Sequence, residues 1–267
     1  MTTRIISGLV MIALTIAVVW YSPAWLFLVI ALVLVVLSCH EYGALVRASD
    51  LPYPAALATV AAALTCASFA RDGLGGAGRI PLDLVLMTAF VAIGALSLAS
   101  WRGGNNALAS ASAALLPCLY FGLPLGAMLA IREAWGPQAL FLLMLTVIVS
   151  DSAQYFTGRA FGRRKLAETI SPKKTVEGAY GGFLFGTLLF VLLGGYWLPA
   201  VPLWLRVLLG VTIVALGIAG DLFESMLKRS AGVKDSSALI PGHGGVLDRI
   251  DAMLFAAPVY YIVLTHV

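Results

Sequence analysis

The feature that most constrains this chain is a series of long apolar stretches that almost lack charged residues. No side chain in residues 5–39 is charged, and across the 267 residues 61% are hydrophobic and only 11% charged. Because a helix rises about 1.5 Å per residue, roughly 20 apolar residues cross the ~30 Å hydrocarbon core of a bilayer. This composition predicts an integral membrane protein and excludes a soluble enzyme, an acidic disordered tail and a secreted disulfide scaffold.

The apolar stretches predict an all-α polytopic protein with about nine transmembrane helices. The stretches lack the two-residue alternation of barrel strands, and only helices and closed barrels satisfy the backbone in lipid. Pro23 and its neighbours break the first stretch, which favours a helical hairpin over a cleaved signal peptide. The expected spans are residues 5–21, 24–39, 54–70, 82–101, 107–131, 137–156, 178–198, 201–223 and 251–266.

The basic residues predict the orientation of these spans. With the N-terminus in the cytoplasm and the C-terminus outside, 13 of the 17 Lys and Arg residues lie on the cytoplasmic side. Positively charged loops are typically cytoplasmic, so this orientation is favoured over its inverse. The residues left outside are Arg71, Arg79, Arg132 and Arg206.

The charged residues also divide the chain, which we expect to form a single transmembrane domain over residues 1–267. Residues 151–251 hold 11 of the 17 basic and 8 of the 13 acidic side chains. We therefore interpret residues 1–150 as a helical scaffold and residues 151–255 as the catalytic half. Cys39, Cys66 and Cys118 lie far apart in apolar stretches, which predicts small buried side chains rather than a zinc site or disulfides.

A first polar cluster begins at Asp151, which follows a long uncharged stretch. Gln154, Tyr155 and Gly158 share its helical face at i+3, i+4 and i+7. A carboxylate inside a membrane span predicts a polar cavity, and a structural ion pair with a nearby Arg is the alternative.

Downstream of this cluster, Lys173, Lys174 and Thr175 precede a predicted helix. Two ammonium groups, a hydroxyl and the helix N-terminus suit a phosphate. An ordinary positively charged cytoplasmic loop is the alternative for these residues.

A second cluster lies where the eighth span is expected to leave the bilayer. Asp221, Glu224, Ser225 and Lys228 recur at i, i+3, i+4 and i+7, which places them on one helical face. Asp248 and Asp251 are likewise three residues apart on the next helix, and carboxylate oxygens suit Mg²⁺. The intervening loop contains Gly242, His243, Gly244 and Gly245, which fit either a phosphate-binding loop or an ordinary tight turn.

These residues resemble the phosphatidate cytidylyltransferases, also called CDP-diacylglycerol synthases. The family pattern matches in order and spacing at Ser225, Lys228, Arg229, Lys234, Asp235, Pro241, His243, Gly244, Gly245, Asp248, Arg249 and Asp251. Residues 151–158 and 171–178 also resemble the family, so the likeness covers about residues 150–255. The chain departs from the pattern at Gln154, Ser237 and Ala238, which spares the charged positions.

The resemblance implies transfer of CMP from CTP to phosphatidic acid, which gives CDP-diacylglycerol and pyrophosphate at the cytoplasmic face of a bacterial-type inner membrane. It implies Mg²⁺, with a second cation such as K⁺ as an option, and a homodimer, with no nucleic acid as partner. The implied metal ligands are Asp221 and Asp248, then Asp251, and after these Asp151 and Glu224. The implied catalytic residues are Asp221, Asp248, Lys228 and Arg229, and the phosphate-binding residues are Lys173, Lys174, Thr175, Ser225, Lys228, Arg229, Lys234, His243, Gly244 and Gly245.

Two alternatives remain open at this point. A cytidylyltransferase that acts on another lipid phosphate, such as a prenyl-glycerol phosphate, would carry the same residues. A cation-coupled transporter would also place carboxylates such as Asp151 and Asp221 within its spans.

Overall fold

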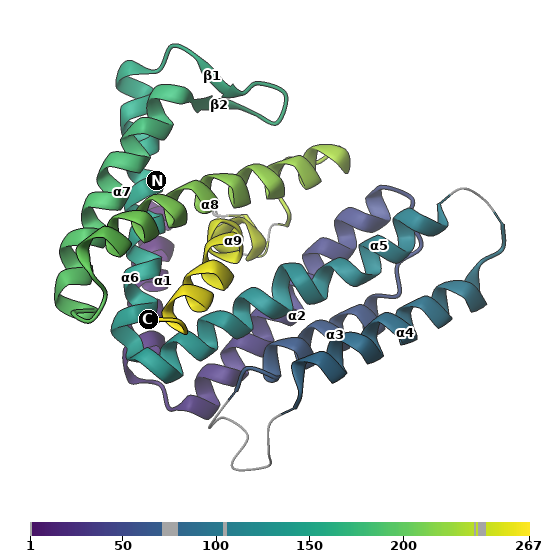
Figure 1. Ribbon diagram of the computed structural model, residues 1–267. Coiled ribbons are helices and arrows are strands. Elements are labelled where there is room, and N and C mark those ends of the chain that lie inside the picture. Colours follow the sequence, from purple (N-terminus) through teal and green to yellow (C-terminus); the bar gives the residue numbers. More distant parts are fainter. Residues whose placement is uncertain (1, 71–79, 104–105, 238, 240–243) are drawn as a thin grey trace.

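The computed structural model of the protein describes residues 2–70, 80–103, 106–237, 239 and 244–267, and it is predominantly helical (Figure 1). The prediction of an all-α membrane protein is confirmed. The helices are α1 (Thr2–Tyr21), α2 (Ala24–Ala48), α3 (Ala55–Ala67), α4 (Leu82–Ser100), α5 (Ala107–Pro117), the π-helix η1 (Cys118–Gly122), α6 (Leu123–Phe161), α7 (Val176–Trp197), α8 (Leu203–Ser230) and α9 (Leu247–Leu264).

Each of the predicted spans overlaps a helix. In the described ranges, five helical segments are long and apolar enough to cross a membrane: Ala24–Ala48, Leu82–Ser100, Ala107–Phe161, Val176–Trp197 and Leu203–Ser230. The total of nine crossings therefore stays a prediction.

The segment Ala107–Phe161 contains two of the predicted spans, and a sharp bend separates them. Gly136 adopts φ 81° and ψ 173°, a backbone conformation open mainly to glycine, and Pro137 follows it. The bend lies between the predicted ranges 107–131 and 137–156. The predicted end of one span and start of the next therefore agree with the position of the bend.

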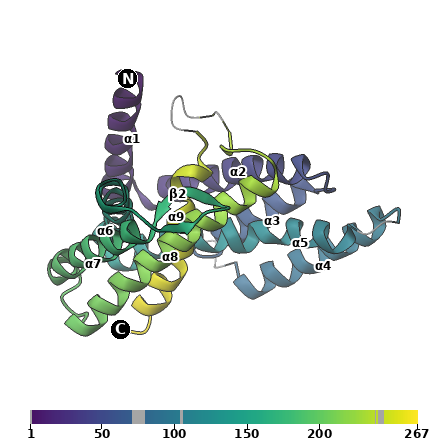
Figure 2. The ribbon, with the colours of Figure 1, turned by 90° about the horizontal axis from the view of Figure 1, so that it is seen from above.

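The helices form two groups with α8 and α9 between them. Figures 1 and 2 show α2, α3, α4 and α5 together on one side, and α7 with the second half of α6 on the other. α8 packs against both α7 and α9, and α9 also packs against α6. This arrangement places α8 and α9, which carry the second polar cluster, between the two groups of helices.

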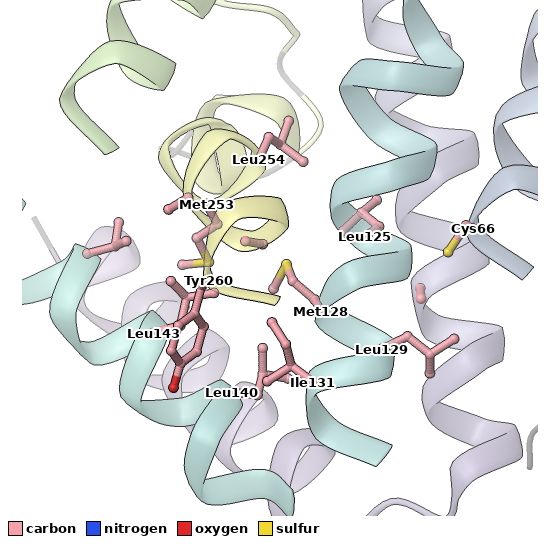
Figure 3. Packing of buried hydrophobic residues seen from close by; sticks show 14 of the residues in the cluster. Cys66, Leu125, Met128, Leu129, Ile131, Leu140, Leu143, Met253, Leu254 and Tyr260 are labelled. Carbon is pink, nitrogen blue, oxygen red and sulfur yellow. The ribbon is translucent and has the colours of Figure 1, made fainter. Parts of the chain in front are cut away.

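A hydrophobic core joins α9 to both halves of α6 (Figure 3). Leu129 and Ile131 from the first half and Leu140 from the second half are fully buried there. Tyr260 on α9 is also buried, and its hydroxyl donates a hydrogen bond of 3.3 Å to the carbonyl oxygen of Ala139. The core therefore fixes α9, which carries two of the predicted metal ligands, against the bent helix α6.

A row of glycines lets α7 approach α6 closely. An added Cβ at Gly178 would lie 2.7 Å from the carbonyl oxygen of Gln154, and one at Gly182 would lie 2.6 Å from Cγ of the same residue. At Gly186 an added Cβ would lie 3.0 Å from Cβ of Ser150. Small residues spaced by four are typical of close helix pairs in membranes. No hydrophobic driving force acts between helices in lipid, so close packing of the two backbones helps to hold such a pair together.

This contact makes a stability prediction for Gly178→Ala. The new methyl group would meet backbone, which cannot rotate away, so we expect a loss of about 1–3 kcal/mol, measured as a lower midpoint of thermal unfolding in detergent. Gly94→Ala is the matched control, because an added Cβ there meets nothing within 4 Å and Ala favours a helix. An unchanged midpoint for Gly178→Ala would contradict the close packing.

A small two-stranded antiparallel sheet was not predicted. β1 (Lys165–Ala167) pairs with β2 (Ser171–Thr175) between α6 and α7. The strands are only three and five residues long, and the hairpin is interrupted by a register shift, so no alternating pattern marks it in the sequence.

Candidate active site

The polar residues gather where the C-terminal end of α8 meets the N-terminal end of α9. α8 continues as a helix to Ser230, two turns past the predicted end at residue 223. Ser225 donates a 3.4 Å hydrogen bond to Oδ1 of Asp221, and Lys228 forms an ion pair with Glu224. These contacts confirm the predicted shared face of α8.

Lys228 also links α8 to α9. Its ammonium group lies 2.5 Å from Oδ1 of Asp248 and contacts Oε2 of Glu224. Glu224 is 1% exposed and Lys228 8% exposed, so water solvates this group of charges poorly. Buried charges require partners, and the single ammonium group between two carboxylates is therefore essential to the junction.

Backbone and hydroxyl donors hold the other oxygen of Asp248. Oδ2 accepts hydrogen bonds from the N–H of Gly245 at 2.8 Å and from the hydroxyl of Ser236 at 2.9 Å. Asp248 precedes the predicted span 251–266. Burial raises the pKa of Asp248, but the hydrogen bonds from Lys228 and Gly245 outweigh it and hold that pKa below its ordinary value. The side chain is thus a fixed carboxylate at neutral pH.

A second ion pair connects the hairpin to α8. Nζ of Lys174 on β2 lies 2.7 Å from Oδ2 of Asp221, and both side chains are mostly buried. Lys173, the preceding residue of the strand, is exposed. The two predicted phosphate-binding lysines therefore have different surroundings, and only Lys174 reaches the carboxylates of α8.

Asp151 and Asp251 lie near this second ion pair. α8 and α9 cross so closely that a Cβ added at Gly220 would lie 2.6 Å from the carbonyl oxygen of Asp251. The charges of Asp151 and Asp221 both act on the carboxylate of Asp251, which accepts a hydrogen bond from the N–H of Ala252. The acidic side chains of Asp151 on α6, Asp221 on α8 and Asp251 on α9 thus lie near one another.

The start of α7 is organised by Thr175 and Glu177. Oγ1 of Thr175 caps the helix by accepting a hydrogen bond from the N–H of Gly178 at 3.1 Å. Oε2 of Glu177 accepts hydrogen bonds from the N–H groups of Arg163 and Arg164 at 2.9 and 3.1 Å. Glu177 therefore fixes the basic loop beside β1.

The remaining predicted residues lie around this junction. Arg229 is exposed and donates to the carbonyl oxygens of Ile170 and Val233, and Lys234 is exposed. An added Cβ at Gly244 would lie 2.7 Å from Oδ2 of Asp248, so this glycine adjoins the site. His243 lies outside the described residues, and its predicted role stays a prediction.

Comparison with known proteins assigns the chain to a family. A model of the cytidylyltransferase family matches residues 2–267. The chain belongs to the cytidylyltransferase family. A Pseudomonas aeruginosa phosphatidate cytidylyltransferase is 34% identical over 98% of this chain and 96% of its own length. A Synechocystis relative with the same name is 36% identical over the same shares, and one from Thermotoga maritima is 37% identical over 68% of each chain.

The donor chemistry of the candidate site in this cytidylyltransferase fits Mg²⁺. Within the described ranges, no three His, Cys, Asp or Glu side chains lie close enough together to hold a metal ion by themselves. Mg²⁺ rarely needs such a cage, because it is usually bound by one or two carboxylates together with waters and substrate phosphates. Asp221 and Asp248 contact different lysines, so their convergence on a common ion stays a prediction.

Two residues that sequence reasoning did not single out lie beside the candidate site. Glu41 on α2 is buried and accepts hydrogen bonds from the backbone of Val246 and Leu247. Tyr120 on η1 is 4% exposed and lies within electrostatic range of Glu224, and its hydroxyl has no hydrogen-bond partner among the described residues. Both belong to the half interpreted as scaffold. The only sequence signal was a lone Glu directly after an apolar stretch.

Proposed function

We propose that this protein transfers CMP from CTP to phosphatidic acid and releases CDP-diacylglycerol and pyrophosphate. The observation that carries this proposal is the group of paired carboxylates and lysines where α8 meets α9, within a membrane protein of the cytidylyltransferase family. The full-length relatives named phosphatidate cytidylyltransferase support phosphatidic acid as the acceptor.

The proposed reaction is a single in-line displacement. A phosphate oxygen of phosphatidic acid attacks the α-phosphorus of CTP, a new P–O bond forms, and the bond to the β-phosphate breaks. The electron pair of that bond leaves with pyrophosphate, so the reaction needs no protein nucleophile. The main obstacle is the repulsion between two polyanions, which positioned cations reduce.

In our proposal, the lysines position the substrate phosphates and the carboxylates hold the metal ion. Lys174 and Lys228, each held by a carboxylate, would position phosphate oxygens, and Arg229 would attract the anionic substrates at the surface. Asp221 and Asp248 would hold Mg²⁺, with Asp251 and then Asp151 and Glu224 as further ligands. When bound, this ion neutralises charge on the CTP phosphates.

The site must lie where lipid meets water, since phosphatidic acid stays in its leaflet and CTP cannot enter hydrocarbon. The basic loop, the hairpin and the C-terminal ends of α6 and α8 are on the side that the charge distribution assigns to the cytoplasm. We therefore place the active site at the cytoplasmic face of the inner membrane.

The two lysines of β2 are expected to differ in their effect on CTP binding. Lys174→Ala should raise the KM for CTP at least tenfold, because a hydrogen bond between charged groups contributes about 1.5–3 kcal/mol. Lys173→Ala should raise the KM for CTP less, since the Lys173 side chain is exposed. The double variant Lys173→Ala with Lys174→Ala should change the KM for phosphatidic acid less than the KM for CTP. Steady-state kinetics in mixed micelles measure both constants. An unchanged KM for CTP in Lys174→Ala would refute the assignment.

The acceptor is tested by comparing lipid phosphates with the same headgroup and different tails. We expect the purified protein to use phosphatidic acid at least tenfold more efficiently, in kcat/KM, than a prenyl-glycerol phosphate. The reverse preference would establish the alternative cytidylyltransferase. Sodium-dependent uptake into proteoliposomes without consumption of CTP would instead support the transporter, which family membership already disfavours.

A further inference from the structure

Glu41 is a buried carboxylate with four hydrogen-bond donors from two short segments of the catalytic half. The side chain is on α2 and only 2% exposed. Oε1 accepts from the hydroxyl of Ser237 at 2.6 Å and the N–H of Val246 at 2.9 Å, and Oε2 accepts from the hydroxyl of Ser236 and the N–H of Leu247, both at 2.9 Å. Each oxygen thus has one backbone N–H and one serine hydroxyl within hydrogen-bond distance, which provides polar partners for the carboxylate in a buried place.

This carboxylate connects to Asp248 through one side chain. Oγ of Ser236 lies 2.9 Å from Oε2 of Glu41 and 2.9 Å from Oδ2 of Asp248, and its single hydroxyl hydrogen is shared between the two carboxylates. Asp248 in turn accepts from the N–H groups of Ser236 and Gly245. The donors that hold Asp248 are therefore on the same short segments that Glu41 holds.

The same contact explains a glycine of the family pattern. A Cβ added at Gly245 would lie 2.0 Å from Oγ of Ser236 and 2.4 Å from Oε2 of Glu41. No side chain fits while the carboxylate occupies this position. Ser237, one of the departures from the family pattern, supplies the shortest of the four hydrogen bonds.

We propose that Glu41 is a positioning residue for CMP transfer, which fixes the first turn of α9 and thereby orients the carboxylate of Asp248. The inference rests on the proposed function, because Asp248 belongs to the proposed active site. Glu41 contacts neither substrate in this account and acts through Ser236 and the backbone of α9.

Glutamine cannot replace Glu41 in this role. Its amide offers one oxygen, and its NH₂ group would face donors from Ser236 and Leu247 or from Ser237 and Val246. The backbone N–H on that side would lose its acceptor and meet another donor, whereas the serine hydroxyl there can turn and accept from the NH₂ group. The start of α9 is then expected to shift, and a displacement near 1 Å at a catalytic group costs about 100-fold in rate.

The test combines kinetics with amide hydrogen exchange on the full chain in detergent. For Glu41→Gln we expect kcat to fall about 100-fold, with both KM values within threefold of wild type. Exchange at the amides of Val246 and Leu247 should rise, while exchange in α7 stays as in wild type. Ser38→Ala is the matched control on the same helix, because its buried hydroxyl has no hydrogen-bond partner in the part of the chain that the structure describes. This control should match wild type in both readouts.

Two results would overturn the proposal. One is wild-type kcat and wild-type exchange at Val246 and Leu247 in Glu41→Gln, and the other is faster exchange throughout the protein, which indicates a merely structural role. If Glu41→Gln does not fold, Ser236→Ala takes its place, and a kcat within threefold of wild type would then contradict the coupling to Asp248. Failure of the proposed function would give a different result, because the wild-type protein itself would then make no CDP-diacylglycerol. In that case hydrogen exchange in Glu41→Gln would still show whether Glu41 holds the start of α9.

Discussion

Replacing Asp221 or Asp248 by Asn should lower the rate of CMP transfer about 1000-fold or more. Each substitution keeps the shape of the side chain and removes the negative charge that we assign to Mg²⁺ and to a lysine. Loss of a single preorganised electrostatic contact typically costs 10²–10³-fold in rate, and here one substitution disturbs two such contacts. The measurement is the rate of transfer of labelled CMP to phosphatidic acid by purified protein.

The control for both variants is Asp83→Asn on α4, where an exposed carboxylate lies at the first turn of a distant helix. This variant should retain the wild-type rate. Both site variants should still insert and purify as folded protein, which gel filtration in detergent reports. Rates close to wild type in either site variant would be incompatible with the assigned metal ligands.

Lys228→Met is the second change with a large expected effect. It removes the one ammonium group between Glu224 and Asp248 and leaves two carboxylates without it. Removing one partner of a buried ion pair costs about 3–5 kcal/mol, because the remaining charge is uncompensated. We expect a markedly lower unfolding midpoint together with loss of activity.

Lys173→Met serves as the stability control, since Lys173 is exposed on β2 and its loss should change the free energy of unfolding by less than about 0.5 kcal/mol. The double variant Glu224→Leu with Lys228→Met should be more stable than Lys228→Met alone, because it removes one of the two unpaired carboxylates. A single variant as stable as wild type would show that Lys228 is not needed to balance the buried charges.

The residues of α8 show how much of the site can be predicted from sequence. Periodicity places Asp221, Ser225 and Lys228 on one helical face, and the contacts of the structure agree with it. Such a prediction needs only local geometry, because residues four apart on a helix are neighbours regardless of the fold.

Partners distant in the sequence could not be predicted in this way. Glu41 lies about 200 residues from its donors, at a point where the predicted span ends but α2 continues to Ala48. The pairing of Lys174 with Asp221, rather than Lys173, depends on the face that β2 presents, and the hairpin itself was not expected. These features follow from tertiary packing, which overrides local patterns at helix ends.

The most direct test of the account follows both ends of the CTP triphosphate in one reaction. Purified protein is given phosphatidic acid and CTP labelled at the α- or the γ-phosphate, with Mg²⁺ present or removed by a chelator. We predict that the α label enters the lipid phase and the γ label stays in water as pyrophosphate, in equal amounts and only with Mg²⁺. An α label that never reaches the lipid, or that reaches it equally well without a divalent cation, would contradict the account.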